Sequence, residues 1–135
     1  MTANVEVASR GEFSDAELNG LHADAFDHDV LHVPWNERVR AHSLTWFVAR
    51  CGGGLVGFIN VIGDGGAHAV ALDTCVSPSL QGRGIGRSLV EAAAHEAQRL
   101  GCHWLHVDYE PHLVRFYEGS CGLRPTNAGL LKLSD

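Results

Sequence analysis

The chain has 135 residues, of which 45% are hydrophobic, and a formal net charge of −6. This length suits one domain, residues 1–135, that buries roughly two-thirds of the surface of its unfolded chain. The acidic balance argues against a nucleic-acid partner and favours a cationic or amine ligand. No apolar run reaches the roughly 18 residues of a membrane-spanning helix, which argues against a membrane partner.

The N-terminal sequence and the cysteines indicate a location in the cytoplasm. Residues 1–6 do not have the pattern of a signal peptide, and the four cysteines show no Cys-x-x-Cys spacing. We therefore expect a cytoplasmic protein whose cysteines are free thiols and are not joined in disulfides.

The first half of the chain predicts three strands and two helices. Ser14 and Glu17 have the spacing of a capping box and open the first helix, and Pro34 suits the first turn of the second. Three consecutive glycines form the turn of a hairpin. The expected elements are strands at residues 4–9, 44–50 and 55–62 and helices at residues 14–26 and 34–42.

The second half predicts alternating strands and helices. They are strands at residues 67–76, 103–109 and 130–133, a long helix that ends at Leu100 with Gly101 as its cap, and a short helix opened by Pro111. The full order, β-α-α-β-β-β-α-β-α-β, predicts an α+β fold, a mixed α/β sandwich built on a mixed sheet.

The most informative segment lies between the strand at residues 67–76 and the long helix. A strand, a glycine turn and a helix in this order direct free backbone N–H groups and the positive end of the helix dipole at one point. Glycine lets an anion approach the backbone closely, and two arginines add positive charge. The segment therefore predicts a cradle for a pyrophosphate. Its residues are Gln81, Gly82, Arg83, Gly84, Ile85, Gly86, Arg87 and Ser88.

Three known glycine motifs compete for this segment. A Walker loop places Lys before Ser or Thr, whereas Arg87 stands before Ser88 here. A dinucleotide fingerprint spaces its glycines as Gly-x-Gly-x-x-Gly near the start of a βαβ unit, and neither condition is met. Residues 81–86 match the Gln/Arg-x-x-Gly-x-Gly/Ala signature of the GNAT superfamily, so the chain resembles these acyl-CoA-dependent N-acyltransferases. An ordinary glycine-rich turn is the alternative.

A second pattern supports the resemblance. Residues 116–118, Phe-Tyr-Glu, followed by Gly122 and Leu123, are similar to the pattern of the superfamily's fourth helix. The resemblance implies a central, mostly antiparallel mixed sheet flanked by about four helices, with acetyl-CoA as the co-substrate. It implies an N-acetyltransferase, monomeric or homodimeric, that moves an acetyl group to a primary amine of a small molecule or an exposed protein amine by direct attack in a ternary complex. Glu110 stands where the superfamily often has Asn, which keeps a non-catalytic CoA-binding or regulatory module as the alternative.

The resemblance also places the chemistry. The pantetheine arm of acetyl-CoA would pair with the backbone of Cys75, Val76 and Ser77, and the N–H of Val76 is the candidate donor to the oxyanion. The hydroxyl of Tyr117 is the candidate acid for the departing thiolate because the two groups have similar basicity. A core tyrosine with a satisfied hydroxyl is the alternative for Tyr117.

The sequence leaves several candidates for the general base. Asp73 is a charged residue within an apolar strand, and it is the candidate base or amine-orienting group. Some members of the superfamily have the base one residue earlier, where this chain has Leu72, and strand alternation predicts that positions 72 and 73 face opposite sides. His68, Asp108, Glu110 and a relay of water molecules are further alternatives.

Nine histidines raise the question of a metal. His28 and His32 have helical spacing, but the segment around them predicts a loop and no third ligand follows at a motif spacing, so we expect no metal site. In the superfamily, the loop between the first two helices covers the acceptor. The equivalent segment, residues 24–37, could attract a cation through its carboxylates, and Phe26 and Trp35 could contact an apolar portion of the acceptor.

Overall fold

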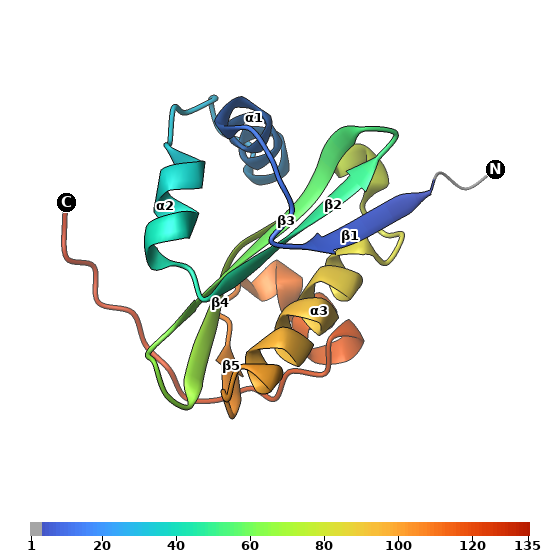
Figure 1. The fold of residues 1–135 in the computed structure, drawn as a ribbon. Coiled ribbons are helices and arrows are strands. Elements are labelled where there is room, and N and C mark those ends of the chain that lie inside the picture. The colour runs from blue at the N-terminus through green and yellow to red at the C-terminus, as the bar shows by residue number, and fades with distance from the viewer. Residues whose placement is uncertain (1–3) are drawn as a thin grey trace.

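The structure, a computed structural model, describes residues 4–135 as a five-stranded sheet with helices on both faces (Figure 1). A 3₁₀ turn (Pro78–Leu80) follows the fourth strand, and a second (Pro111–Leu113) leads into a π-helical segment (Arg115–Ser120). The strands are β1 (Val5–Ser9), β2 (Thr45–Cys51), β3 (Gly54–Gly63), β4 (His68–Val76) and β5 (Trp104–His106). The α-helices are α1 (Asp15–Phe26), α2 (Trp35–His42) and α3 (Ile85–Arg99).

The sheet joins its strands in chain order, β1-β2-β3-β4-β5. Neighbouring strands are antiparallel except β4 and β5, which are parallel and are therefore connected by a crossover that contains α3. This mixed, mostly antiparallel sheet with its flanking helices confirms the predicted α+β class. None of the described helices is both long enough and apolar enough to cross a membrane.

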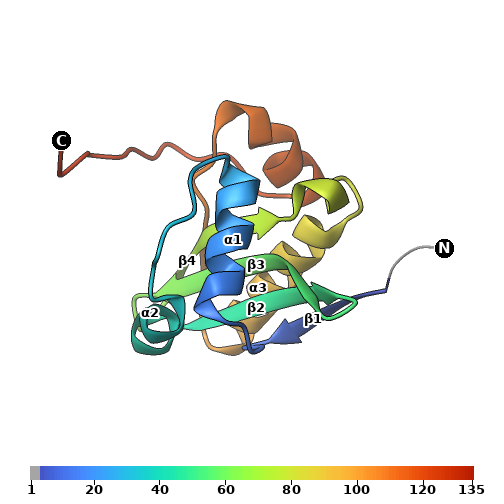
Figure 2. The same cartoon turned by 90° about the horizontal axis from the view of Figure 1, so that it is seen from above.

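Side chains alternate along β2 and divide the core into two layers. Trp46 and Val48 pack beneath α1 and α2, whereas Phe47 and Ala49 pack beneath α3. Both faces of this strand are buried, which is why its sequence is apolar at successive positions and does not alternate with polar residues. Figure 2 shows α1 running across the strands on the first of these faces.

The C-terminal part of the chain differs most from the sequence prediction. β5 covers only three residues of the strand predicted at residues 103–109, and the prediction of a strand at residues 130–133 is wrong. The tail extends away from the body of the protein (Figures 1 and 2), and its three leucines are exposed. An apolar run forms a strand when a neighbouring strand supplies hydrogen-bond partners, and within residues 4–135 no strand pairs with the tail.

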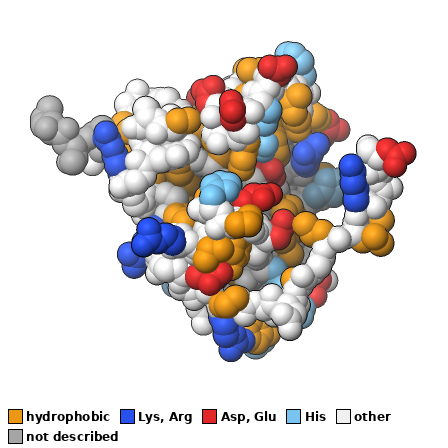
Figure 3. Space-filling view, turned by 180° about the vertical axis from the view of Figure 1, so that it is seen from behind, with side chains coloured by type: hydrophobic (Ala, Val, Ile, Leu, Met, Phe, Trp, Pro, Cys, Tyr) orange, Lys and Arg blue, Asp and Glu red, His pale blue; other side chains and the backbone are white. Residues whose placement is uncertain are grey.

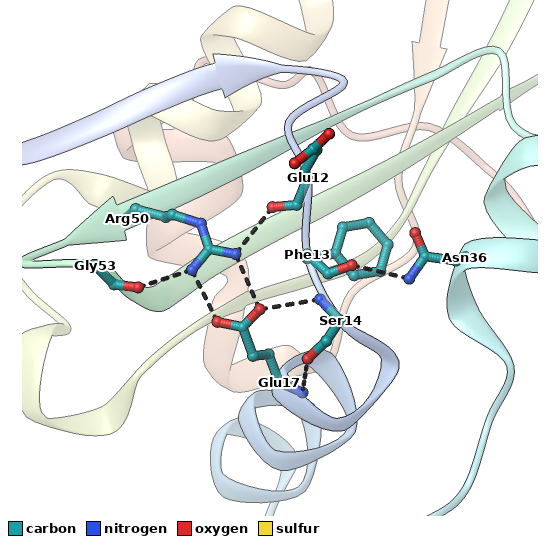
Figure 4. A network of polar contacts seen from close by, with 7 residues as sticks. All are labelled: Glu12, Phe13, Ser14, Glu17, Asn36, Arg50 and Gly53. Carbon is teal, nitrogen blue, oxygen red and sulfur yellow. Dashed lines mark hydrogen bonds and ion pairs between the residues drawn. The ribbon is translucent and has the colours of Figure 1, made fainter.

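A polar network fixes the start of α1 on the sheet (Figure 4). Ser14 and Glu17 form the predicted capping box, in which each side chain accepts a hydrogen bond from the other residue's backbone N–H at 3.0 Å. The Arg50 guanidinium of β2 donates to both carboxylate oxygens of Glu17, at 2.8 and 3.0 Å. It also donates to the carbonyl oxygens of Glu12 and Gly53. The network thus joins the first turn of α1 to β2 and to the β2–β3 turn.

Replacing Glu17 by glutamine is expected to lower the free energy of unfolding by about 1 kcal/mol at pH 7. The hydrogen bond from Arg50 is the largest of the causes that lower the pKa of Glu17 to about 2, and the partial exposure of both side chains keeps the effect modest. Because the pKa is lower in the folded state, the stabilisation is complete above the ordinary value of 4.5 and is lost as the pH falls toward 2. Urea-induced unfolding at pH 7 and at pH 3 measures both points.

Glu12→Gln is the matched control for this prediction. Arg50 contacts the backbone carbonyl of Glu12, which the substitution keeps, so the stability of this variant should stay close to that of the unaltered protein at both pH values. The assignment would be contradicted by equal losses in the two variants, or by a loss in Glu17→Gln that does not shrink at pH 3.

Candidate active site

A β-bulge interrupts β4 near its C-terminal end. Ile59 of β3 alone lies opposite two residues of β4, Asp73 and Thr74, and Asp73 has a left-handed backbone with φ +56°. The extra residue reverses the faces of the strand. Ala71, before the bulge, packs on the side of α3, whereas Cys75, after it, packs on the side of α1 and α2.

The bulge corrects the expected orientation of Asp73. Strand alternation from Ala71 places Leu72 on the α1 side and predicts that Asp73 turns to the α3 side. Instead the side chain of Asp73 reaches α1, where its Oδ1 lies 3.2 Å from Nε2 of His22. Both side chains are mostly buried, with 27% and 19% exposure. The predicted base therefore lies on the same face as Leu72, the alternative position.

His22 extends this contact into a chain of hydrogen bonds that sequence reasoning did not find. Its Nδ1 lies 2.8 Å from Nε2 of His28, and Nδ1 of His28 lies 2.6 Å from the carbonyl oxygen of Asp29. The available signal was the position of His22 four residues after Leu18, which places both side chains on the face of α1 that meets the sheet.

The two aromatic residues of the segment at residues 24–37 differ in their exposure. Trp35 is buried at 3% exposure between α1 and α2, and its Nε1 donates to Asn19 at 3.0 Å, so the expectation that it contacts an acceptor is wrong. Phe26 is 45% exposed and its ring lies 4.5 Å from that of His22. His28 contacts His22, and no group of three or more His, Cys, Asp or Glu side chains within residues 4–135 is arranged to hold a metal ion.

Within residues 4–135, the C-terminal half of β4 has no strand partner on the side of β5, and we call this unpaired side of the strand the gap. Pairing with β5 ends at Val70, so the following residues of β4 have no β5 partner on that side. The N–H of Ser77 donates to Val56 of β3 at 2.8 Å. In an antiparallel pair, adjacent residues direct their backbone groups in opposite directions, so the N–H of Val76 points into the gap and that of Ser77 does not. Burial raises the pKa of the Cys75 thiol, which leaves this residue a backbone role.

The N-terminus of α3 lies at the end of this gap and has free donors. No side chain caps it, and Gly84, at the cap position, has φ +85°. A Cβ added to Gly84 would meet no atom within 4 Å, whereas one added to Gly86 would lie 3.0 Å from the ring of Phe116. Gly84 thus leaves open space in front of the first-turn N–H groups, and Gly86 allows the π-helical segment to pack against α3.

Positive charge surrounds this helix end. Arg83, Gly84 and Ser88 line a hollow of about 230 Å³. Arg87 donates to Glu91 at 2.8 Å, and both side chains are well exposed. An exposed pair of this kind is weak, so Arg87 is available to a phosphate. Four of the eight residues of the predicted cradle, Arg83, Gly84, Ile85 and Ser88, therefore line one hollow, and the binding of a pyrophosphate there stays a prediction.

Tyr117 approaches the bulge from the α3 side. It lies on the π-helical segment, is buried at 6% exposure, and stacks on Tyr109 with ring centroids 4.8 Å apart. Burial raises the pKa of the Tyr117 phenol, and a hydrogen bond with Thr74 lowers it in part. The phenol therefore keeps its proton at neutral pH, which a general acid requires. Asp73 and Thr74, adjacent in the bulge, thus face His22 and Tyr117 respectively.

The other candidate bases differ from Asp73 in position. His68 begins β4, and its Nδ1 lies 2.8 Å from Nε2 of His106. Glu110 is exposed and precedes the second 3₁₀ turn. Asp108 is exposed, and its charge contributes to raising the pKa of Tyr117. These three side chains therefore do not share the contact of Asp73 with α1.

Comparisons with known proteins identify the family of this chain. The family described as Acetyltransferase (GNAT) family matches residues 12–123. Serotonin N-acetyltransferase 2, chloroplastic, from Oryza sativa subsp. japonica is 31% identical over 123 residues, which cover 83% of this chain and 62% of that protein. The chain thus spans less than two-thirds of the length of this relative.

Solved structures show the same fold. Glucosamine-6-phosphate N-acetyltransferase from Arabidopsis thaliana superimposes with a TM-score of 0.82 at 18% identity, over 98% of this chain and 99% of that one. Aminoglycoside N-acetyltransferase AAC(6')-Iy in complex with CoA gives a TM-score of 0.78 at 18% identity, over 99% and 97% of the two chains.

The chain belongs to the GNAT family of acetyltransferases. The resemblance drawn from residues 81–86 and 116–118 is confirmed, and with it acetyl-CoA as the co-substrate that this family uses. The uncapped N-terminus of α3 and the unpaired edge of β4 lie next to each other in the chain, and the hypothesis that they bind the pyrophosphate and the pantetheine arm stays a prediction.

Replacing Gly84 by aspartate is expected to weaken CoA binding at least tenfold relative to Gly84→Asn, a difference of about 1.4 kcal/mol. Asn and Asp tolerate a positive φ to a similar extent and have the same shape, so the pair isolates the negative charge placed beside the pyrophosphate. Isothermal titration calorimetry with CoA measures the difference. Equal affinities in the two variants, with the fold intact by circular dichroism, would show that the phosphate lies elsewhere.

Proposed function

We propose that this chain transfers the acetyl group of acetyl-CoA to a primary amine, of a small molecule or exposed on a protein, by direct attack in a ternary complex. The bulge in β4 is the observation that supports this proposal most strongly. It adjoins the gap that would take the pantetheine arm, and it directs Asp73 to one side and Thr74, with Tyr117, to the other. A thioester at this point would have a basic group on one side and an acidic group on the other.

The donor side of the site would bind and polarise the thioester. The first-turn N–H groups of α3, with Arg83 and Arg87, would bind the pyrophosphate. The pantetheine arm would then run along β4 toward the bulge. The N–H of Val76, which points into the gap, would donate to the carbonyl oxygen as negative charge develops on it in the transition state.

Tyr117 would complete the transfer. The amine nitrogen attacks the carbonyl carbon, the C–N bond forms, and collapse of the tetrahedral intermediate breaks the C–S bond. The sulfur leaves as a thiolate and takes the phenolic proton of Tyr117. The buried position and raised pKa of this phenol keep the proton available until the thiolate forms.

The acceptor side favours a cationic amine. Asp73 is the candidate for orienting the amine or accepting its proton. The C-terminal end of α1 and the π-helical segment lie toward the face drawn in Figure 3. Acidic, histidine and apolar side chains gather near the centre of this face, and Lys and Arg lie nearer its rim. The names of the similar proteins, which act on serotonin, on glucosamine 6-phosphate and on aminoglycosides, also favour an amine acceptor.

A thiol-release assay tests the proposed function. The protein would be incubated with acetyl-CoA and a panel of aliphatic, aromatic, amino-sugar and lysine-containing peptide amines, and products would be identified by mass spectrometry. We expect thiol release that depends on one class of amine, with one acetyl group added to that amine. CoA binding by calorimetry without release of thiol in the presence of any amine would instead support the non-catalytic CoA-binding module that Glu110 keeps open.

Tyr117→Phe is expected to lower kcat by about 10²-fold, the lower end of the usual range for general acid catalysis. The substitution keeps the ring and its packing and removes the hydroxyl, so KM for acetyl-CoA should change little. Steady-state kinetics with saturating amine measures both constants.

Tyr109→Phe is the matched control. Tyr109 stacks on Tyr117, and its hydroxyl donates to Glu118 at 2.8 Å, so its loss leaves the proposed acid in place. The kcat of this variant should stay within about threefold of the unaltered value. A similarly small loss in Tyr117→Phe would make Tyr117 a packing residue.

A further inference from the structure

Proton balance sets a requirement that Tyr117 alone does not meet. Acetylation of an ammonium acceptor, R–NH₃⁺, forms the C–N bond, breaks the C–S bond and yields R–NH–CO–CH₃ and the thiol. Of the three N–H protons, one stays on the amide and one replaces the proton that Tyr117 gives to sulfur. The third must reach solvent. An acceptor that binds as a neutral amine has no third proton to lose.

The hydrogen bonds around His22 hold one extra proton. Three contacts link Asp73, His22, His28 and the carbonyl oxygen of Asp29, and each needs one hydrogen. A carboxylate and a carbonyl oxygen supply none, and two neutral imidazoles supply two. When all three contacts are hydrogen bonds, the chain therefore contains one proton more than the Asp73 carboxylate and two neutral imidazoles. This count is the same whichever atom binds the extra proton. The arrangement is the protonated form of a base.

The chain also leads from the site to solvent. Asp73 lies in the bulge, and the His22 ring is enclosed, with the rings of Phe26 and Trp35 at 4.5 and 5.5 Å. The ring of His28 follows and is exposed to solvent. A proton accepted at the inner end can thus leave from the outer end without crossing the apolar core.

Few charged groups other than these face His22. Asp73 faces it from β4 and His28 from the loop after α1. From α2, Arg38 lies over the ring of Trp35 at 5.0 Å, and Trp35 in turn contacts His22. The carboxylate of Asp73 is thus the charged side chain within hydrogen-bond distance of His22.

We infer that Asp73, His22 and His28 form a proton relay that accepts the third proton of an ammonium acceptor and delivers it to solvent. This inference rests on the proposed function. When the relay has lost its extra proton, two hydrogens remain for three contacts. One contact then lacks a hydrogen bond, and a lone pair on a nitrogen or on the carboxylate is free to accept a proton. The ammonium proton closes the chain, the neutral amine attacks, and His28 returns a proton to water.

The sharpest kinetic test compares two amines that differ in basicity. Benzylamine is mostly protonated at neutral pH, whereas aniline is mostly neutral. With saturating acetyl-CoA at pH 7, His22→Gln should lower kcat for benzylamine by about 10²-fold, and His28→Gln by about tenfold because water can replace an exposed group. For aniline, both losses should stay under about threefold. Raising the pH should restore the benzylamine activity of the variants, and KM for acetyl-CoA should not change.

His106→Gln is the matched control. His106 forms the other histidine pair, with His68 at 2.8 Å, outside the proposed relay, and its loss should leave both activities unchanged. A loss in His22→Gln that is equal for the two amines at every pH would show a packing or binding role and overturn the relay. A loss under about threefold for benzylamine would overturn it as well.

Nitrogen NMR of the imidazole rings tests the shared proton without turnover. His22 and His28 should change protonation together, as two coupled groups do. Independent titration of the two rings would overturn the relay. Failure of the proposed function is a separate result, since it would appear as absence of thiol release by the unaltered protein with every amine, whereas every result that overturns the relay alone leaves thiol release by the unaltered protein intact.

Discussion

The single inserted residue in β4 is the constraint on which the site depends. Asp73 adopts φ +56°, a conformation that costs a non-glycine residue of order 1 kcal/mol and that Asp tolerates better than most. Without the bulge, Cys75 would pack against α3 and Asp73 would not reach His22 on α1. With the bulge, both layers of the core stay apolar. The adjacent polar side chains of Asp73 and Thr74 leave the strand on opposite faces. The contact with His22 offsets part of the backbone cost.

The position of α1 matters as much as the bulge, because His22 must meet Asp73 across the sheet surface. Arg50 and the capping box fix the first turn of α1 to β2. One turn before His22, Asn19 accepts hydrogen bonds from Nε1 of Trp35 and from the N–H of Val33, and its amide donates to the carbonyl of Val33. The first two turns of α1 are therefore tied to neighbouring elements, and the position of His22 depends on contacts outside the chain of hydrogen bonds that it forms.

The donor side of the site is predictable from the sequence, whereas the acceptor side is not. Residues 81–88 encode their geometry locally, through glycines with positive φ and the start of a helix, and the pattern at residues 116–118 indicated Tyr117, which forms a hydrogen bond with Thr74 of the bulge. The bulge is a matter of register between β3 and β4, which alternation along one strand does not reveal. His22 occupies a core position of its helix and resembles a packing residue until its partner is known. The strand predicted at residues 130–133 failed because a strand requires a neighbour.

The location of the cradle follows from topology. β4 and β5 are parallel, so the chain must cross over between them, and the helix that makes this crossover begins where β4 ends. That places the positive end of α3 near the C-terminal end of β4, which corresponds to the carboxyl ends of strands where parallel α/β sheets bind their ligands. The short pairing of β5 leaves backbone donors of β4 free at the same point. The donor side thus uses features that any chain with this crossover can supply, whereas the acceptor side is built from individual side chains of α1 and its following loop. On the proposed function, substitutions of partly exposed residues of α1 are therefore expected to change the acceptor while the donor side, and the fold that forms it, stay intact.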